Sequence, residues 1–452
     1  MALTKDELAL INSLRLVHYR QRNRDLLLRA YFRGAQSFEQ LGMMVPPSMR
    51  SFRVIANWPR VVVRTITRRQ QVRSLMLPGV EDDAPELRSI WLANNLDLGI
   101  RTYNKDCAIY GRSFLAVFDG ENGDEPIVRP VSPLEMAVDV VDGQIVAAAR
   151  FYGGTTSAIP GDNPLKVSLY RDGLTVWASK RDGAWVETGR DDHGKRIPII
   201  MGLNEALTGE FVGESAMADV MPITDSAARA LTNMQFGVDA HGLPRLWASG
   251  VQRGDFVDKD GNVVTRWEQY FNNVWLMKDP QAKIGAVPAS DLKNFDTALE
   301  TYGKQAATVT GFPGRYFGLT TANPPSADAI RADEAELVEA VEDQNLSAGV
   351  TIGWALAAAW EIKTGERLDG DRIKVEWHDP ATPTVGQRTD AVVKLRQSGV
   401  LTREGVWDEL GWSEERKEKE RARFDIEASS DPIVSAARSL TNGAGSAAAG
   451  GQ

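Results

Sequence analysis

From Ser326 to about Lys363, nothing in the sequence breaks a helix except Gly349 and Gly353. A helix of that length would exceed roughly 50 Å at about 1.5 Å per residue. Ser326 is a suitable N-cap residue, and the two glycines predict a bend. Because a compact enzyme rarely contains such an element, this stretch favours an extended, mostly helical α+β protein.

Two further helices are predicted before this stretch, at about 215–240 and 289–310. Each has apolar residues at alternating spacings of three and four, which gives one apolar seam on a 3.6-residue period. The seam of the first helix contains Val220, Ile223, Ala227, Leu231, Met234 and Val238. Between the two helices, residues 241–288 alternate apolar and polar positions and contain several turn signals, so a small β-rich module is expected there. A loop of roughly fifteen residues rich in glycine and proline follows, and loops of this length are often functional or disordered.

The N-terminal third is predicted to be helical and then β-rich. Thr4 and Glu7 form a capping box for a helix that Gly34 closes, and further helices are expected from Asn57 to Val72 and over 84–110. Residues 113–201 have a period of two, interrupted by Asp-Gly steps that predict hairpins. Strands are expected at 114–118, 126–128, 136–138, 145–148, 167–170 and 175–177. After the long helix, a short strand near 375–377 and three helices are expected, and Thr402 is predicted to cap the second of these helices. A Gly/Ala/Ser-rich tail that is predicted to be disordered follows.

Several motifs in a fixed order resemble one known family. The motifs are Gly213-Glu214-Ser215, the run Asp225–Leu231, Leu243-Pro244-Arg245, and Asn323–Ile330 before an acidic helix. In this order they resemble the portal proteins of long-tailed double-stranded-DNA bacteriophages, in particular those that infect actinobacteria. The resemblance extends from about Asp6 to Glu427, nearly the whole chain, and depends on the order of many weak motifs.

The resemblance implies a portal fold with wing, stem, clip and crown. The expected boundaries are N-terminal helices and wing 1–212, stem helices 213–240 and 289–311, clip 241–288, tunnel loop 312–325, long wing helix 326–369, crown 370–428 and disordered tail 429–452. About twelve copies would form a ring at one capsid vertex, through which a terminase packages genomic DNA and from which the DNA is later ejected. The implied partners are the terminase large subunit, a head-completion adaptor, and the major capsid and scaffolding proteins. The subunit would be made in the host cytoplasm, without a membrane, and reside in the virion.

Candidate site residues follow from the same resemblance. In the tunnel loop, small polar groups and stiff prolines could touch passing DNA weakly; the candidates are Thr320, Thr321, Asn323, Pro324 and Pro325. Duplex DNA carries about one negative charge per 1.7 Å, so an acidic wall would let it slide. The wall candidates are Asp219, Asp225, Asp239 and Asp328, although ordinary solvated helix faces explain acidic residues equally well. Clip residues Trp247, Trp267 and Trp275 are candidate partner contacts, with core packing as the alternative.

No catalytic constellation is found in the sequence. A Walker A motif does not occur, the four histidines have no metal-ligand spacing, and Gly213–Met217 lacks the second glycine of a nucleophile elbow. The one cysteine, Cys107, predicts a reducing compartment and no internal disulfide. We therefore expect no enzyme activity, no metal and no cofactor.

Two other functions remain open at this level. Residues 1–80 hold fourteen lysines and arginines against four acids, a net charge of +10. Such a segment can bind DNA phosphates, bind an acidic partner or only meet solvent. A DNA-processing enzyme that uses this segment is one alternative, and a capsid scaffold without a channel is the other.

Overall fold

The computed structural model describes residues 3–37, 54–77, 84–120, 125–154, 159–241, 246–249, 283–286, 293–320, 326–381, 385–412 and 414–430. The chain divides into two compact units, the first comprising Met1–Pro324 with Ala332–Pro380 and the second Pro325–Arg331 with Ala381–Gln452. Helices and strands both contribute throughout the first unit, which confirms the predicted α+β class.

The helices of the first unit are α1 (Lys5–Arg33), α2 (Trp58–Thr67), α3 (Pro85–Ala93), α4 (Leu96–Tyr110), α5 (Val220–His241), α7 (Lys293–Thr310) and α9 (Ala335–Thr364), with 3₁₀ turns η4 (Gly314–Phe317) and η5 (Gly370–Arg372). Its strands are β1 (Val72–Met76), β2 (Arg112–Phe118), β3 (Ile127–Val131), β4 (Met136–Val141), β5 (Gln144–Tyr152), β6 (Lys166–Arg171), β7 (Leu174–Arg181), β8 (Ala184–Asp192), β9 (Ile199–Leu203), β10 (Leu246–Ser249), β11 (Lys283–Ala286) and β12 (Lys374–Trp377). The second unit holds α10 (Val385–Gln397), α11 (Arg403–Glu409) and α12 (Glu414–Ser430), and α8 (Ala327–Asp333) begins in the second unit and ends in the first.

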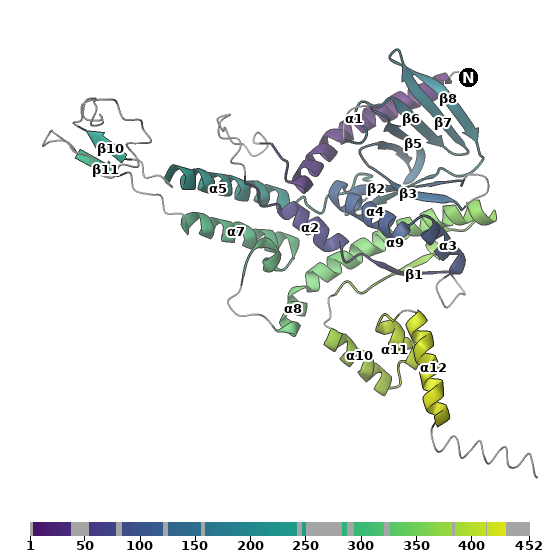
Figure 1. The fold of residues 1–452 in the computed structure, drawn as a ribbon. Coiled ribbons are helices and arrows are strands. Elements are labelled where there is room, and N and C mark those ends of the chain that lie inside the picture. The colour runs from purple at the N-terminus through teal and green to yellow at the C-terminus, as the bar shows by residue number, and fades with distance from the viewer. Residues whose placement is uncertain are drawn as a thin grey trace, which may run out of the picture. The chain divides into compact units, whose positions relative to one another are not determined.

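Helix α1 begins and ends as its sequence predicts. The Thr4 hydroxyl accepts a hydrogen bond from the Glu7 amide at 3.2 Å, and the Glu7 carboxylate accepts one from the Thr4 amide at 2.9 Å. Gly34 ends the helix at φ 65°, in the left-handed region that favours glycine. Ile11 and Leu14 are fully buried against the sheet that contains β4 and β5, over which α1 lies (Figure 1).

The predicted strands form two antiparallel sheets. Strands β4 to β8 follow one another in a five-stranded meander, and β2 lies between β3 and β9 in the other sheet. The Asp142-Gly143 and Asp182-Gly183 steps both have two successive residues at positive φ, as type I′ hairpin turns require. The prediction missed β8 and β9. Strand β8 is mostly exposed, and its second half, Glu187–Asp192, has no apolar residue to mark a buried face.

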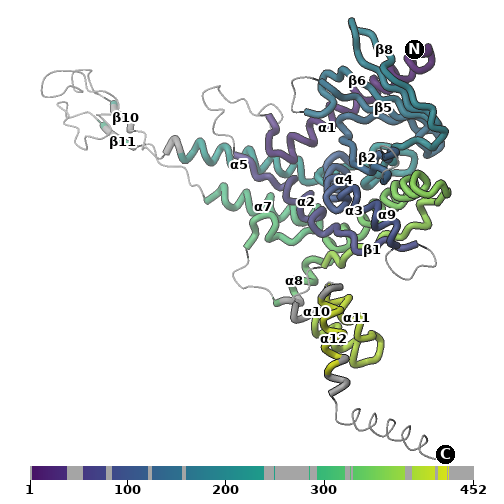
Figure 2. The backbone as a smooth tube through the Cα atoms, turned by 45° about the vertical axis from the view of Figure 1, so that its right-hand side comes forward, coloured from purple at the N-terminus to yellow at the C-terminus, as the bar shows by residue number. Residues whose placement is uncertain are grey.

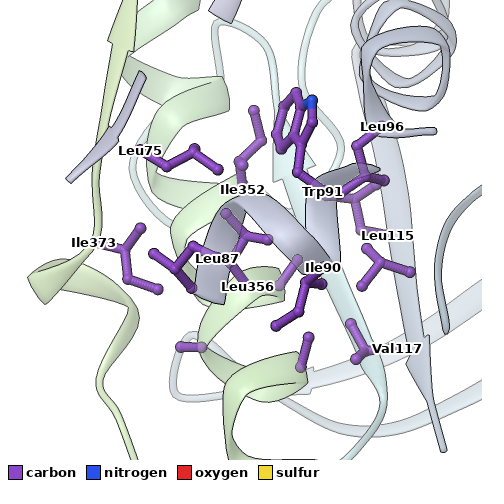
Figure 3. Close-up of a cluster of buried hydrophobic side chains, with 14 of the residues drawn as sticks. Leu75, Leu87, Ile90, Trp91, Leu96, Leu115, Val117, Ile352, Leu356 and Ile373 are labelled. Atoms are coloured by element: carbon purple, nitrogen blue, oxygen red, sulfur yellow. The ribbon is translucent and has the colours of Figure 1, made fainter. Parts of the chain in front are cut away.

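A core of large apolar side chains lies where α3, α4, β2 and α9 meet. Trp91, Leu87 and Ile90 from α3 pack against Leu115 from β2 and Leu356 from α9 (Figure 3). Each of these side chains is at most 1% exposed. The C-terminal half of α9 therefore lies deep in the first unit and fixes the positions of the elements around it.

Two predicted helix boundaries near this core are wrong. The helix expected over 84–110 is two helices, because Asn95 takes a left-handed conformation with φ 49°. The helix expected to reach Val72 ends at Thr67, since Val72 starts β1. That strand pairs with β12 across some 300 residues of chain, as in Leu75 opposite Val375. This pairing places residues 370–380 in the first unit.

The long helix also differs from its prediction. Its regular hydrogen bonding is interrupted at Glu334, between α8 and α9, and it continues unbroken through Gly349 and Gly353. A Cβ atom at Gly353 would lie 2.5 Å from the carbonyl oxygen of Gly370. Gly353 is thus required for the close approach of η5.

A buried ion pair joins α1 to β2. The Arg112 guanidinium donates two hydrogen bonds to the Asp25 carboxylate, at 2.7 and 3.1 Å, and a third at 3.1 Å to the Gln21 side chain. Both charged side chains are 1% exposed. Removing either partner would leave an uncompensated charge in the interior, so the pair holds α1 in one register on β2.

Glu7 gives the first unit a testable pH dependence. Hydrogen bonds from Arg190 on β8 are the main cause that lowers the pKa of Glu7 from 4.5 to about 2. A carboxyl group with a depressed pKa in the folded state stabilises the fold fully above its unfolded pKa, and this stabilisation is lost as the pH falls from about 4.5 to about 2.

We expect the melting temperature of the wild type to fall more steeply over this pH range than that of Glu7→Gln. Thermal unfolding followed by circular dichroism tests this. Asp6→Asn, one residue away on the exposed side of α1, should keep the steep wild-type dependence. Parallel curves for the wild type and Glu7→Gln would contradict the role of Glu7.

The second unit has its own small core. The Trp407 ring stacks on Trp412 and on Phe424, with ring centroids 5.8 and 5.9 Å apart. Thr402 caps α11 by accepting a hydrogen bond from the Gly405 amide, as predicted. Helix α12 continues to Ser430, and the tail predicted to be disordered lies almost entirely outside the described residues. A search of the described helices finds none with the length and apolar character needed to cross a membrane.

Candidate functional site

Helices α5 and α7 lie side by side and carry the predicted stem (Figure 2). Helix α5 begins at Val220 and not at Gly213, because Ser215 starts a turn that precedes the helix. In this turn the Ser215 hydroxyl accepts a hydrogen bond from the Met217 amide at 3.2 Å. Along its predicted seam, Val220 and Ala227 are fully buried. Leu231 is only half-buried and Val238 is 40% exposed. Within the described part of the chain, the distal half of this apolar seam is thus left partly uncovered.

The segment after α7 folds back onto that helix. Gly311 ends α7 at φ 65°, and Phe312 and Phe317 are buried beyond it. The Phe317 ring meets Trp58 of α2 edge to face, with centroids 6.0 Å apart. A Cβ atom at Gly303 of α7 would lie 3.2 Å from the Leu319 side chain, so Leu319 packs directly over the glycine. The first part of the predicted tunnel loop is therefore anchored up to Leu319.

One buried carboxylate fixes the base of this loop. An oxygen of Glu334, at the start of α9, accepts hydrogen bonds from Arg69 at 3.1 Å, from the Tyr316 hydroxyl at 3.3 Å and from Arg315. Arg315 also binds Asp333 at 2.8 Å. Sequence reasoning missed this cluster, since Glu334 lies in an acidic run that resembles a solvated face. The signal that could have found it is the Arg-Tyr pair in the same glycine-bounded loop.

The loop candidates lie just beyond this anchor. Thr320 is exposed and follows Leu319 directly. Thr321, Asn323, Pro324 and Pro325 lie outside the described residues. The described residues begin again at Ser326. Its hydroxyl accepts a hydrogen bond from the Ala329 amide at 3.2 Å, as an N-cap residue should.

The four acidic wall candidates occupy different environments. Asp219 is exposed in the turn before α5. Asp225 is half-buried and accepts a 2.6 Å hydrogen bond from the Tyr31 hydroxyl of α1, and desolvation raises the pKa of its carboxyl group. Asp239 lies in the last turn of α5 and Asp328 in the first turn of α8, by their backbone positions. Asp225 is thus engaged within its own subunit, whereas Asp219 is free to face solvent.

The predicted clip is described only where its two ends meet. Strands β10 and β11 pair in antiparallel fashion, with Trp247 opposite Gly285. Trp267 and Trp275 lie outside the described residues.

A cavity of about 410 Å³ lies between the two sheets and the end of α9, lined by the aromatic rings of Phe118, Tyr170 and Trp177. Three basic side chains in its lining form ion pairs: Lys195 with Asp119 at 2.6 Å, Arg150 with Glu135 at 2.7 Å, and Arg196 with Glu361. At the cavity wall, Nδ1 of His193 accepts a hydrogen bond from the Lys195 amide at 3.0 Å. Nε2 of the same ring lies 3.3 Å from the Thr175 hydroxyl. The ion pair of Arg196 with Glu361 joins this cavity wall to the end of α9.

Residues 28–431 match the phage portal protein family described as SPP1 Gp6-like, and the chain belongs to this family. It is similar to the portal proteins of Mycobacterium phages D29 and L5, each 29% identical over 411 residues, which is 88% of this chain and 84% of the relative. As a family member it is a virion component of a phage.

Solved structures give a more distant likeness. One of them is a chain from the neck of an empty gene transfer agent particle, computed with C6 symmetry. The structural alignment covers 82% of this chain and 95% of that chain. It is 14% identical, with a TM-score of 0.45. A chain from the native particle's neck, computed with C12 symmetry, has a TM-score of 0.43. The family assignment is therefore based on the sequence match alone.

Proposed function

We propose that this portal subunit assembles into a closed ring of about twelve copies that surrounds a DNA channel at one capsid vertex. The observation that supports ring formation best is the incompletely buried seam on the distal half of α5. Leu231 and Met234 are half-buried and Val238 is exposed, although the pattern of the helix is that of a buried seam. A neighbouring copy packed against this seam would complete its burial.

The same ring would conduct DNA. In this proposal, residues 320–325 form the tip of a tunnel loop whose base is held by Leu319 and the Glu334 cluster. Asp219, Asp239 and Asp328 are candidates for the acidic wall, and Asp225 contributes only if the Tyr31 contact opens. A terminase large subunit would drive packaging, and the ring itself would hydrolyse nothing.

The remaining parts of the proposal concern partners. The clip, residues 241–288, would bind the terminase during packaging and then a head-completion adaptor, with Trp247, Trp267 and Trp275 as candidate contacts. The wing would contact the major capsid and scaffolding proteins, and the three helices of the second unit would form the crown. The subunit would be made in the host cytoplasm before it enters the virion.

Native mass spectrometry and negative-stain imaging of the purified full chain test the ring. We expect closed rings of about twelve subunits with an axial hole wide enough for duplex DNA. Rings or shells without an axial hole would favour the channel-less scaffold. A protein that stays monomeric even when co-expressed with its capsid and scaffolding proteins would overturn the proposal.

A further inference from the structure

Helix α2 carries a row of three arginines on its exposed edge. Arg60, Arg64 and Arg68 are four residues apart, so their side chains lie one above the other. Arg64 and Arg68 are exposed, and the Arg60 guanidinium lies 5.7 Å above the Phe32 ring. Desolvation and the charges of Arg60 and Arg68 lower the pKa of Arg64. Within the described ranges, no carboxylate forms an ion pair with any of the three.

Helix α9 presents the opposite charge on its solvent side. One side of α9 is buried through Leu337, Val341 and Ala348. On the opposite side, Glu339 and Asp343 are exposed, and neither forms an ion pair with a basic side chain in the described part of the chain. The carboxyl group of Glu205 is close enough to Asp343 to feel its charge. Partial desolvation raises the pKa of Glu205, and the negative charges of Glu214, Asp219 and Asp343 raise it further. Negative charge is therefore concentrated on this surface.

The solvent side of α9 continues as an apolar stripe. Leu346, Val350 and Trp354 follow at spacings of four and are 73, 56 and 37% exposed. Three large apolar residues in one row on an exposed helix face are unusual for a surface that stays in water. The solvent side of α9 is therefore acidic in one half and apolar in the other.

The two charged surfaces do not meet within one subunit. Helices α2 and α9 both pack on one core, through Val62 and Val63 on one side and Leu337 and Val341 on the other. Arg69, next to the row, points inward and binds Glu334. Arg64 and Arg68 remain exposed. Glu339 and Asp343 lie on the side of α9 opposite the core. Each surface is thus available to a second molecule.

We propose that the solvent side of α9 binds the arginine row of α2 on a neighbouring copy of this chain, with Glu339 and Asp343 against Arg64 and Arg68, and that the same contact covers Leu346, Val350 and Trp354. The inference rests on the proposed ring. Because the contact joins two different surfaces, it is heterologous, and heterologous contacts close into rings by rotation. Duplex DNA on the arginine row would leave the acidic and apolar surface of α9 without a partner, so a second copy accounts for both surfaces.

Charge exchange tests the contact directly. Arg64→Glu with Arg68→Glu, and separately Glu339→Arg with Asp343→Arg, should each raise the subunit concentration needed for assembly by about 10-fold or more, because like charges would face each other. The protein that carries all four substitutions should regain rings, since the charges are then exchanged and opposite again. Native mass spectrometry measures assembly, and circular dichroism checks that each variant is folded. Lys5→Glu with Arg20→Glu, the same charge change on exposed positions of α1, is the matched control and should assemble normally.

The outcomes separate this inference from the proposed function. If the wild type forms rings and both double variants form them equally well, the contact is wrong and the ring stands. If the wild type forms no ring with its capsid partners, the proposed function fails first. Normal rings from Arg64→Glu with Arg68→Glu that bind less duplex DNA in a filter assay would assign the row to DNA and overturn the inference. Failure of the four-substitution protein to regain rings, with folded double variants that cannot assemble, would also overturn the pairing.

Discussion

A Leu231→Asp variant is expected to remain folded but to form no rings. Leu231 is half-buried on α5, away from the fully buried Val220 and Ala227 that hold the helix to its own subunit. If a neighbouring copy covers Leu231, the substitution places a carboxylate in an apolar contact, at a cost of about 3 kcal/mol or more per interface. Such a cost weakens each contact by about 100-fold, and a closed ring repeats it at every interface.

Native mass spectrometry and thermal unfolding together test this expectation. Asn233→Asp introduces the same carboxylate two residues away, on the exposed side of α5, and should leave rings intact. Rings of normal size from Leu231→Asp would contradict the stem assignment. A large loss of melting temperature in the isolated subunit would mean instead that Leu231 serves the fold of its own chain.

Replacement of residues 320–325 by a Gly/Ser segment of equal length is expected to leave rings intact and to abolish most DNA packaging or retention. The exchange begins after Leu319, because Leu319 packs over Gly303 and belongs to the anchor of the loop. Equal length keeps the connection to Ser326, so folding should be little affected. The loss of the prolines and of the polar side chains removes the stiff surface that would touch the DNA.

Packaged DNA per particle and infectious titre measure the effect. A Gly/Ser exchange of Arg181–Ala184, the exposed β7–β8 turn, is the control and should package normally. Normal packaging by the loop variant would exclude these residues from a role in the channel. Rings that fail to form would show that the segment contributes to assembly rather than to DNA passage.

Local signals in the sequence were sufficient for much of the fold. The Thr4 and Glu7 capping box, the Asp-Gly hairpins and the Thr402 cap all depend on residues within a few positions of one another, and the structure confirms them. Long-range contacts were not predictable in this way. The pairing of β1 with β12 joins distant segments, and no local pattern indicates that Val72 starts a strand rather than ends a helix.

The candidate site shows the same division. The apolar spacing of three and four predicted helices α5 and α7, but not which part of the seam is left half-covered. That difference depends on packing against α1, α2 and α9. Likewise, Glu334 and Glu339 look alike in sequence. Glu334 is 5% exposed and binds two arginines, whereas Glu339 is exposed to solvent. The two side chains differ because five positions along a helix change the direction of a side chain by more than a quarter turn.

The pairing of β10 with β11 brings together the two points at which the described chain ends before residue 250 and resumes after residue 282. Ser249 lies opposite Lys283 in the register, so the chain leaves this strand pair and returns to it at adjacent points. A segment inserted there can grow, shrink or be replaced without a change in the separation of α5 and α7. If residues 241–288 bind partner proteins as proposed above, recombination at these two neighbouring positions would exchange the partner contacts and leave α5 and α7 unchanged.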